Sequence, residues 1–482
     1  MNSTELENLF KSDKTDWYSE NPNGSKNWDL SKLNHFWNMI KTHKILKNDF
    51  EFDGFVFPTF YKTNSFWLNT NDIYFDEIFG AIGKLVQCKV RFINCTFQGA
   101  FLFNNFNDPN PNIPKSFINF KKSLEFVNCI FNGEFRLISV NIHENLAIHE
   151  CEFNGEIFIS ENNVLKNLSI YNCFFYNNFS LQVNRINKIN LAVNTFDSLT
   201  GFSKNYYSDI FSLNSCTFNY KTIFIENTYK KYFTLASNSF NDTATFKNES
   251  FLYGNFQDLT FSDKNSSMNE ISIRDSKILK LTNIYFPPNF SFVRCDCMNI
   301  LFKESSIENA KFDSCEWNIS NRLIIKDETD LDTITISSFL KLENIYRQLK
   351  KNFDNQKDWE LSGYAYISEM EMRKKRLFLE NKYGSSFIYW FYGFFGGYTQ
   401  NFLRPILSFL ILTLICSIFY FFIDFDLINA LERGAKGAFP YIEIREEEPY
   451  PKYWLLLKNV QLILSGVFLS FFILALRKRF KQ

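Results

Sequence analysis

A short phrase recurs through the first half of the chain and constrains the fold more than any other feature. It reads Asn-Cys-Thr-Phe-Gln-Gly at 94–99, Asn-Cys-Ile-Phe-Asn-Gly at 128–133, Glu-Cys-Glu-Phe-Asn-Gly at 150–155 and Asn-Cys-Phe-Phe-Tyr-Asn at 172–177. From Phe131 onward the phenylalanine returns every 22 residues, and weaker copies continue the interval at Phe196, Phe218 and Phe240. A fixed period of this length predicts stacked repeats.

Within one copy, apolar residues alternate with polar ones. A period of two indicates short strands, and slips of three or four residues indicate corners between them. Such segments leave no room for crossover helices, so we expect a mainly β fold: a parallel β-helix in which each coil lays its phenylalanine on the coil below. The repeat core then consists of Cys95, Phe97, Cys129, Phe131, Cys151, Phe153, Cys173, Phe175, Cys216 and Phe218.

The spacing resembles that of the pentapeptide-repeat family, in which a small residue precedes a leucine or phenylalanine by two positions. Residues 90–99 form two consecutive units in that register, and residues 124–133, 146–155 and 168–177 match equally well. The rest of each coil is longer than the family's square turn. The resemblance therefore implies a somewhat irregular, right-handed parallel β-helix.

The cysteine and charge patterns limit the chemistry that we expect. The chain has 10 cysteines, and most occupy one repeat position, which suits buried free thiols in a reducing compartment better than disulfides. Cys295-Asp296-Cys297 lacks a second pair at zinc spacing, so we expect no metal and no cofactor. Lysine plus arginine equals aspartate plus glutamate, 52 each, which argues against a nucleic-acid partner.

The chain divides into four parts by pattern. Residues 1–50 are expected to cap the first coil, and residues 51–330 to form the solenoid, with a proline-rich loop at 107–114. Residues 335–384 have helical spacing and resemble the helical hairpin of bacterial pentapeptide-repeat membrane proteins. Glu369, Glu371 and Arg373 in this part suggest an acid–base or metal site, but a charged helix face is the simpler interpretation.

Residues 385–482 are expected to form a membrane module. Residues 405–423 carry no charge over 19 residues, which is about 28 Å of helix, and residues 453–476 are a second candidate span. Basic residues flank both outer ends, whereas acidic residues 443–448 lie between the spans. The positive-inside rule then predicts a multi-pass protein with both termini in the cytoplasm. The resemblance implies that the membrane is the bacterial inner membrane.

Three residues of the second span are candidate pore or association residues. Lys458 and Gln461 are polar groups in an apolar segment, which is by default a functional hypothesis, although Lys458 also suits snorkelling to the headgroups. Gly466, with serines nearby, provides a small face for helix association. In the family that the chain resembles, the segment between the spans can resemble a channel pore loop, but the potassium-filter sequence is absent here.

Several functions remain open at this stage. The first is a cytoplasmic sensor or assembly platform that drives a two-helix module to assemble as a homo-oligomer and to open or disrupt the bilayer. A membrane effector of bacterial stress or phage defence would fit this architecture. The second is a binding scaffold with a protein ligand on the solenoid face or loops and only an anchor in the membrane. A protein that mimics DNA needs an acidic groove, and the balanced charge of this chain argues against that role. We expect no enzyme, because no nucleophile–base set or phosphate loop is recognisable.

Overall fold

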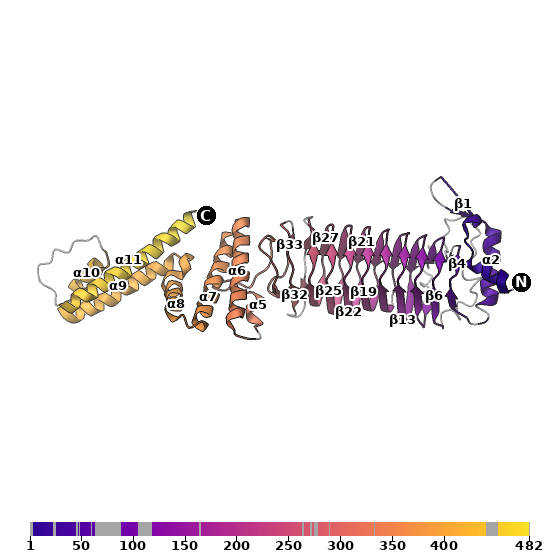
Figure 1. The fold of residues 1–482 in the computed structure, drawn as a ribbon. Helices are drawn as coiled ribbons and strands as arrows, with labels where there is room; N and C mark the ends of the chain where they lie inside the picture. The colour runs from indigo at the N-terminus through magenta and orange to yellow at the C-terminus, as the bar shows by residue number, and fades with distance from the viewer. Residues whose placement is uncertain are drawn as a thin grey trace, which may run out of the picture. The chain divides into compact units, whose positions relative to one another are not determined.

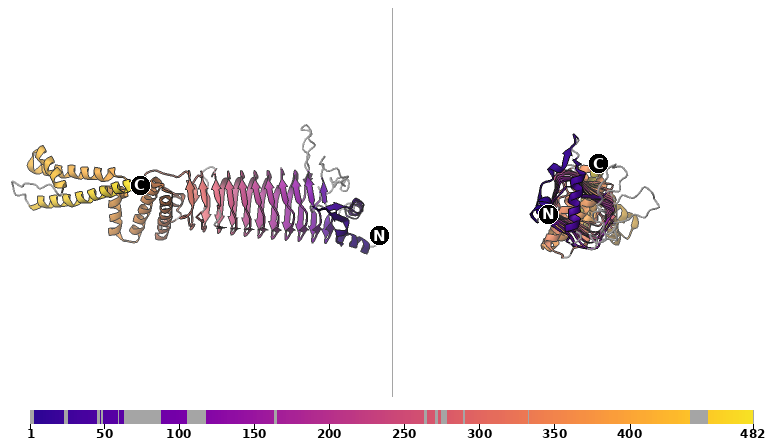
Figure 2. Two further views of the ribbon diagram at one scale, coloured as in Figure 1. Left: turned by 90° about the horizontal axis from the view of Figure 1, so that it is seen from above. Right: turned by 90° about the vertical axis from the view of Figure 1, so that its right-hand side faces the viewer.

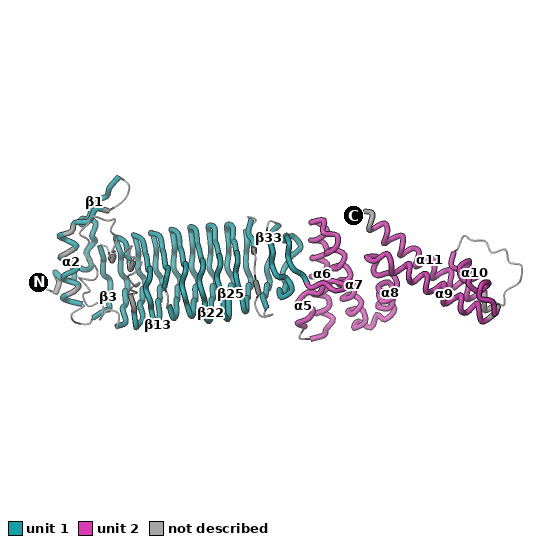
Figure 3. Tube along the Cα trace, turned by 180° about the vertical axis from the view of Figure 1, so that it is seen from behind, with its two compact units in different colours: residues 1–317 teal, residues 318–482 magenta. Residues whose placement is uncertain are grey.

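The computed structural model describes residues 3–22, 26–44, 47, 49–58, 60–62, 88–104, 118–162, 165–262, 265–269, 272–273, 278–288, 290–331, 333–439 and 452–481. Contacts divide the chain into two compact units, residues 1–317 and 318–482 (Figure 3). The proline-rich segment 107–114 and the acidic segment 443–448 lie outside the described residues.

The first unit is a parallel β-solenoid, as the repeat predicts (Figures 1 and 2). In the described residues its coils contribute strands to three parallel sheets. The first sheet contains β3 (Glu51–Asp53), β6 (Val90–Ile93), β10 (Leu124–Val127), β13 (Val140–His149), β16 (Leu165–Tyr171), β19 (Arg185–Ala192), β22 (Tyr206–Asn214), β25 (Thr228–Ala236), β28 (Ser250–Gln257), β32 (Leu279–Thr282) and β34 (Ile300–Leu301), with β9 (Ile118–Phe120) beside β13 and β31 (Ser272–Ile273) beside β28.

The other two sheets repeat the same order coil by coil. The narrow sheet contains β4 (Val56–Phe57), β7 (Thr96–Phe97), β11 (Ile130–Phe131), β14 (Glu152–Phe153), β17 (Phe174–Phe175), β20 (Thr195–Phe196), β23 (Thr217–Phe218), β26 (Ser239–Phe240) and β29 (Thr260–Phe261). The third contains β5 (Phe60–Lys62), β8 (Phe101–Asn104), β12 (Phe135–Ile138), β15 (Ile157–Ser160), β18 (Phe179–Gln182), β21 (Thr200–Ser203), β24 (Thr222–Ile225), β27 (Ala244–Lys247), β30 (Ser267–Asn269), β33 (Ser291–Val293) and β35 (Lys311–Asp313).

A column of phenylalanine rings runs through the core beneath the narrow sheet. Phe97, Phe131 and Phe153 stack with ring centroids 4.6 Å apart and planes within 3° of parallel. The column continues through Phe175, Phe196, Phe218 and Phe240 to Phe261 at spacings of 4.6–5.2 Å. The rings are buried, and each such side chain contributes about 1.5–3 kcal/mol by leaving water. The cysteines of the repeat core are buried beside this column, and all ten cysteines are free.

The corners of the coils are left-handed, at two places in each circuit. One corner directly precedes the cysteine position, as at Asn94, Asn128 and Asn172, where φ is 52–54°. The second follows about 11 residues later, as at Val183 and Lys204, and the first corner also holds a valine, Val193. Asparagine adopts this backbone region readily, whereas a β-branched residue does so rarely, so stacking must impose it at Val183.

The N-terminal segment lies over the first coil. It contains α1 (Ser3–Lys11), the 3-10 helix η1 (Thr15–Trp17), an antiparallel pair of β1 (Tyr18–Glu20) and β2 (Lys26–Trp28), and α2 (Leu30–His43). The side chain of Asp29 accepts hydrogen bonds from the backbone N–H groups of Ser31 and Lys32 and so caps α2. Trp37 of α2 stacks on Phe57, the first ring of the column, at 6.1 Å. This segment thus shields the end of the apolar core.

The second unit is helical. It contains α5 (Lys326–Thr329), α6 (Ile336–Gln356), α7 (Trp359–Leu379), α8 (Tyr383–Gly396), the 3-10 helix η4 (Gly397–Thr399), α9 (Leu403–Asp424), α10 (Leu427–Ala438) and α11 (Lys452–Lys481). Thr335 and Ser338 form a capping box at the start of α6, and Lys357 in the left-handed region ends it. Helices α6 and α7 pack along each other, as do α9 and α10. Two segments, Leu403–Phe422 and Leu455–Lys478, are long and apolar enough to cross a membrane.

Candidate functional site

A polar cluster lies among the two apolar helices α9 and α11 and the amphipathic helix α10. In α9 the polar side chains Thr413, Ser417 and Tyr420 recur every three or four residues and therefore share one helix face. In α11, Gln461 and Ser465 share a face for the same reason. The short helix α10 begins at Asp426, whose carboxylate accepts from the backbone N–H groups of Ile428 and Asn429.

Gln461 lies at the centre of this cluster, and its side chain is fully buried. Its Nε2 donates to the carbonyl oxygen of Gly434 in α10 at 2.7 Å, and the hydroxyl of Tyr420 in α9 approaches its Oε1 at 3.5 Å. One amide thus links all three helices. The hydroxyl of Ser465, one turn further along α11, is buried and has no hydrogen-bond partner among the described residues.

Two glycines let α10 approach the other helices closely. A Cβ on Gly434 would overlap the hydroxyl of Ser417, and a Cβ on Gly437 would lie 2.7 Å from Oε1 of Gln461. Ala430 and Ala438 are also buried on this face of α10. Small residues at this spacing allow helix backbones to pack closely in an apolar environment.

The outer faces of α9 and α11 are apolar and exposed. Only 22% of each apolar window is buried, whereas the core helix of a soluble protein is mostly buried. Leu407, Ile411 and Ile418 of α9 and Leu456, Ile463 and Ile473 of α11 are all more than half exposed. These faces require an apolar surrounding or a partner, because water solvates such a surface poorly.

The three residues predicted from the second span lie in different surroundings. Gln461 lies inside the cluster, and Lys458 is half-buried on α11 one turn before it. Gly466 faces open space, because no heavy atom lies within 4 Å of the position where its Cβ would be. Gln461 thus contacts α10 directly, through its hydrogen bond to Gly434.

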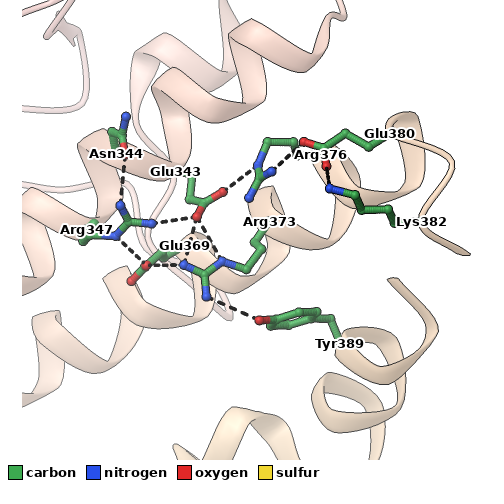
Figure 4. A network of polar contacts seen from close by, with 9 residues as sticks. All are labelled: Glu343, Asn344, Arg347, Glu369, Arg373, Arg376, Glu380, Lys382 and Tyr389. Atoms are coloured by element: carbon green, nitrogen blue, oxygen red, sulfur yellow. Dashed lines mark hydrogen bonds and ion pairs between the residues drawn. The ribbon is translucent and has the colours of Figure 1, made fainter. Parts of the chain in front are cut away.

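A charged network joins α6, α7 and α8 (Figure 4). The carboxylate of Glu343, which is 2% exposed, accepts from Arg347 at 2.6 Å and from Arg373 and Arg376 at 2.9 Å each. Glu369, also buried, accepts from Arg347 at 3.0 Å and from Arg373 at 3.3 Å. Burial alone would lower the pKa of Arg373, but its contacts with Tyr389 and Glu343 raise it, so the guanidinium stays charged.

This network answers the acid–base question raised by Glu369, Glu371 and Arg373. Both carboxylates bind basic groups: Glu371 pairs with Lys374 at 2.6 Å and accepts from the Tyr398 hydroxyl at 2.8 Å. Within the described ranges, no group of three histidine, cysteine or carboxylate side chains is placed to hold a metal ion. These ion pairs and hydrogen bonds hold helices α6, α7 and α8 together.

A second ionic contact anchors the segment that precedes α6. Arg322 binds both carboxylate oxygens of Glu328 at 2.6 and 2.7 Å, and the hydroxyl of Tyr346 donates to the same carboxylate at 2.7 Å. Burial would raise the pKa of Glu328, but the hydrogen bonds from Arg322 and Tyr346 hold it below its ordinary value. This contact fixes the start of the helical unit.

The solenoid core contains a column that the sequence analysis missed. A buried amide follows four successive second corners: Asn162, Asn184, Asn205 and Asn227, each donating from Nδ2 to the side-chain oxygen in the next coil at 2.9–3.1 Å. The column ends at Glu249, whose Oε1 accepts from Asn227. The spacing of 21–22 residues was visible in the sequence, but asparagine there is easily interpreted as a turn residue.

Glu249 is a buried carboxyl, and none of the described groups that shift its pKa carries a positive charge. Its Oε2 and the hydroxyls of Tyr207 and Tyr229 are buried and have no hydrogen-bond partner of ordinary geometry among the described residues. Burial raises the pKa of Glu249 to about 8, although the hydrogen bond from Asn227 and the nearby hydroxyl of Tyr229 act in the opposite direction. The carboxyl is therefore mostly protonated at neutral pH.

Comparison with protein-family models, with curated proteins and with solved structures found no match to this chain.

Proposed function

We propose that this protein is a membrane-inserted assembly platform, in which a cytoplasmic β-solenoid controls a helical module that self-associates and permeabilises the bilayer. The observation that carries the proposal is the combination found in α9–α11. The outer faces of the two long helices are apolar and exposed, whereas their inner faces enclose the buried amide of Gln461. An intramembrane polar group facing a bundle interior is typical of a pathway or an assembly contact.

The finer features of the proposal rest on the resemblance and on charge. The solenoid is proposed to be right-handed and of the pentapeptide-repeat type, and α6 and α7 to be the helical hairpin of the related membrane proteins. Arg404 and the Arg477–Lys481 run flank the outer ends of the spans, which favours cytoplasmic termini at the inner membrane. The free cysteines are compatible with that compartment. Phage defence or another stress response is the proposed setting.

The first test compares cells that express the full chain with cells that express residues 1–403. The full chain is expected to fractionate with membranes, to slow growth and to lower the membrane potential, whereas the truncated chain does none of these. A full chain that fractionates with membranes but leaves the potential unchanged at high expression would contradict pore formation.

A second test addresses the polar cluster directly. Gln461→Leu keeps a side chain of similar size but removes both hydrogen bonds, and we expect it to reduce dye release from vesicles containing purified protein by at least about tenfold. The matched control is Ile463→Leu on the exposed face of the same helix, which is expected to leave release unchanged. Equal release by the two variants would exclude the cluster from the activity.

An alternative proposal is a non-catalytic scaffold that binds a protein and uses the helices only as an anchor. Exposed tyrosines on the solenoid favour it, because aromatic side chains dominate protein interfaces; Tyr220, Tyr232 and Tyr285 are each more than half exposed. Replacing residues 403–482 with an unrelated two-span anchor distinguishes the two. A scaffold keeps its cellular effect after the exchange, whereas a permeabilising module loses it.

A further inference from the structure

An apolar groove opens on the helical unit between α6, α7 and α8. Its volume is about 510 Å³, and it is lined mainly by Phe339, Phe378, Leu379, Tyr383, Phe387 and Trp390. Ser386 of α8 donates to the carbonyl oxygen of Lys374 in α7 at 3.1 Å, which fixes the two helices at one end of the groove. The aromatic rings Phe387 and Trp390 stack at 5.6 Å along one wall.

The aromatic wall belongs to a helix face that water would solvate poorly. Phe378, Tyr383 and Phe387 are 57–60% exposed, and Trp390 is 44% exposed. The adjacent face of α8 packs on the second candidate span: Phe395 lies 5.1 Å from Phe468 of α11, and Phe391 lies 6.1 Å from the same ring. Helix α8 is therefore held beside a candidate membrane segment with its exposed rings turned outward.

The two lysines of the groove, Lys374 and Lys375, belong to a set of ion pairs in which basic groups outnumber carboxylates. In the described residues, these ion pairs join seven basic groups to five carboxylates. The basic groups are Arg322, Arg347, Arg373, Lys374, Lys375, Arg376 and Lys382, and the carboxylates are Glu328, Glu343, Glu369, Glu371 and Glu380. Lys374 and Lys375 line the groove itself. Lys375 is 44% exposed and lies 3.5 Å from Glu328, a carboxylate that Arg322 already binds through both oxygens.

We infer that this groove binds an anionic phospholipid, with an acyl chain against the aromatic wall and the phosphate group near Lys374 and Lys375. An apolar channel next to a surplus of positive charge complements both parts of such a lipid. Aromatic side chains such as Trp390 are also favoured at the level of the headgroups. The inference rests on the proposed membrane insertion, but it does not require that a pore forms.

Native mass spectrometry of the detergent-solubilised full-length protein measures lipid binding directly. We titrate phosphatidylglycerol and phosphatidylcholine with the same acyl chains and expect at least one phosphatidylglycerol to bind more tightly. Lys375→Gln is expected to weaken phosphatidylglycerol binding by about fivefold, the effect of one basic group near an anionic lipid, and to leave phosphatidylcholine binding unchanged. Equal binding of the two lipids to the wild-type protein would overturn the inference.

The position of the lipid is tested with neighbouring variants of α8. Phe387→Ala removes a groove ring, whereas Ile388→Ala removes an adjacent side chain that is 66% exposed but does not line the groove. Only Phe387→Ala should weaken phosphatidylglycerol binding, by several-fold. Equal effects of the two changes would mean that lipid only coats the helix, and would overturn a specific site.

A fluorescence measurement identifies the occupant in the membrane. Phosphatidylglycerol with brominated acyl chains should quench tryptophan emission of the full-length protein in vesicles, and Trp390→Phe should remove part of that quenching. If a second copy of the chain fills the groove instead, Trp390→Phe leaves the quenching unchanged, and the inference fails. Lipid binding that persists in vesicles that never leak would contradict the proposed permeabilisation and leave this inference intact.

Discussion

At the scale of single residues, Glu249 sets the electrostatics of the solenoid interior. Each asparagine before Glu249 both accepts and donates a hydrogen bond along the column. The final position needs only to accept a hydrogen bond from Asn227. A carboxyl supplies that acceptor, although its burial raises its pKa to about 8 from an ordinary value of 4.5. Among the described residues, Tyr207, Tyr229, Asn227 and Glu226 interact with it, and none of these four carries a positive charge.

This arrangement predicts a definite pH dependence. Because the pKa in the folded state lies above that in the unfolded state, folding takes up a proton. The contribution of Glu249 to stability is therefore complete below pH 4.5 and is lost as the pH rises to about 8, at about 1.4 kcal/mol per pH unit. Glu249→Gln is expected to raise the melting temperature of the detergent-solubilised protein more at pH 8 than at pH 5. Glu152→Gln, an exposed change on another coil, should show no such difference, and similar behaviour of the two would contradict the assignment.

Glycines of the repeat phrase allow neighbouring coils to approach closely. Gly99, Gly133 and Gly155 lie one above another, so that a Cβ on Gly155 would overlap the carbonyl group of Gly133. Gly155→Ala is therefore expected to destabilise the solenoid by about 1–3 kcal/mol, measured by thermal unfolding. Gly201→Ala is the matched control, since its Cβ would have no neighbour closer than 4.0 Å. Equal stability of the two variants would show that the coils can move apart at Gly155 without loss of free energy of unfolding.

At the scale of elements, the parallel solenoid could be predicted because one residue type carries the signal. Phenylalanine at a fixed interval has to stack, and Phe131, Phe153 and Phe175 do so. The asparagine column was missed because asparagine is common both at corners and in buried hydrogen-bonded columns. Asn184 and Asn205 belong to the buried column because each directly follows a left-handed corner residue, Val183 or Lys204. The burial of Gln461 depends on α10, whose glycines define a contact face only once its neighbours are known.

The charged network predicts how α6, α7 and α8 respond to the loss of one carboxylate. Glu343→Gln leaves Arg347, Arg373 and Arg376 sharing less negative charge in a partly buried site. Removing one partner of a buried ion pair typically lowers the free energy of unfolding by about 3–5 kcal/mol. Because Arg347 is exposed, we expect a loss of about 3 kcal/mol for this variant. Hydrogen exchange of α6 and α7 amides should increase, whereas Glu360→Gln on the exposed face of α7 should leave it unchanged. Unaltered exchange in Glu343→Gln would mean that apolar contacts alone hold these helices.

At the scale of the whole molecule, two glycines lead to different predictions, one for the packing of α10 and one for the proposed assembly. Gly434 lies within a protomer against Ser417, whereas Gly466 faces open space and is a candidate contact between copies. Gly466→Leu is therefore expected to reduce oligomers in native mass spectrometry and to abolish dye release, while α10 remains packed on α9. Gly434→Leu should displace α10 and expose Cys416, which is 4% exposed in the intact protomer, to a thiol reagent. Oligomers of normal size in Gly466→Leu would remove this face from the assembly, and the exposed surface of α9 would then be the remaining candidate for contact between copies.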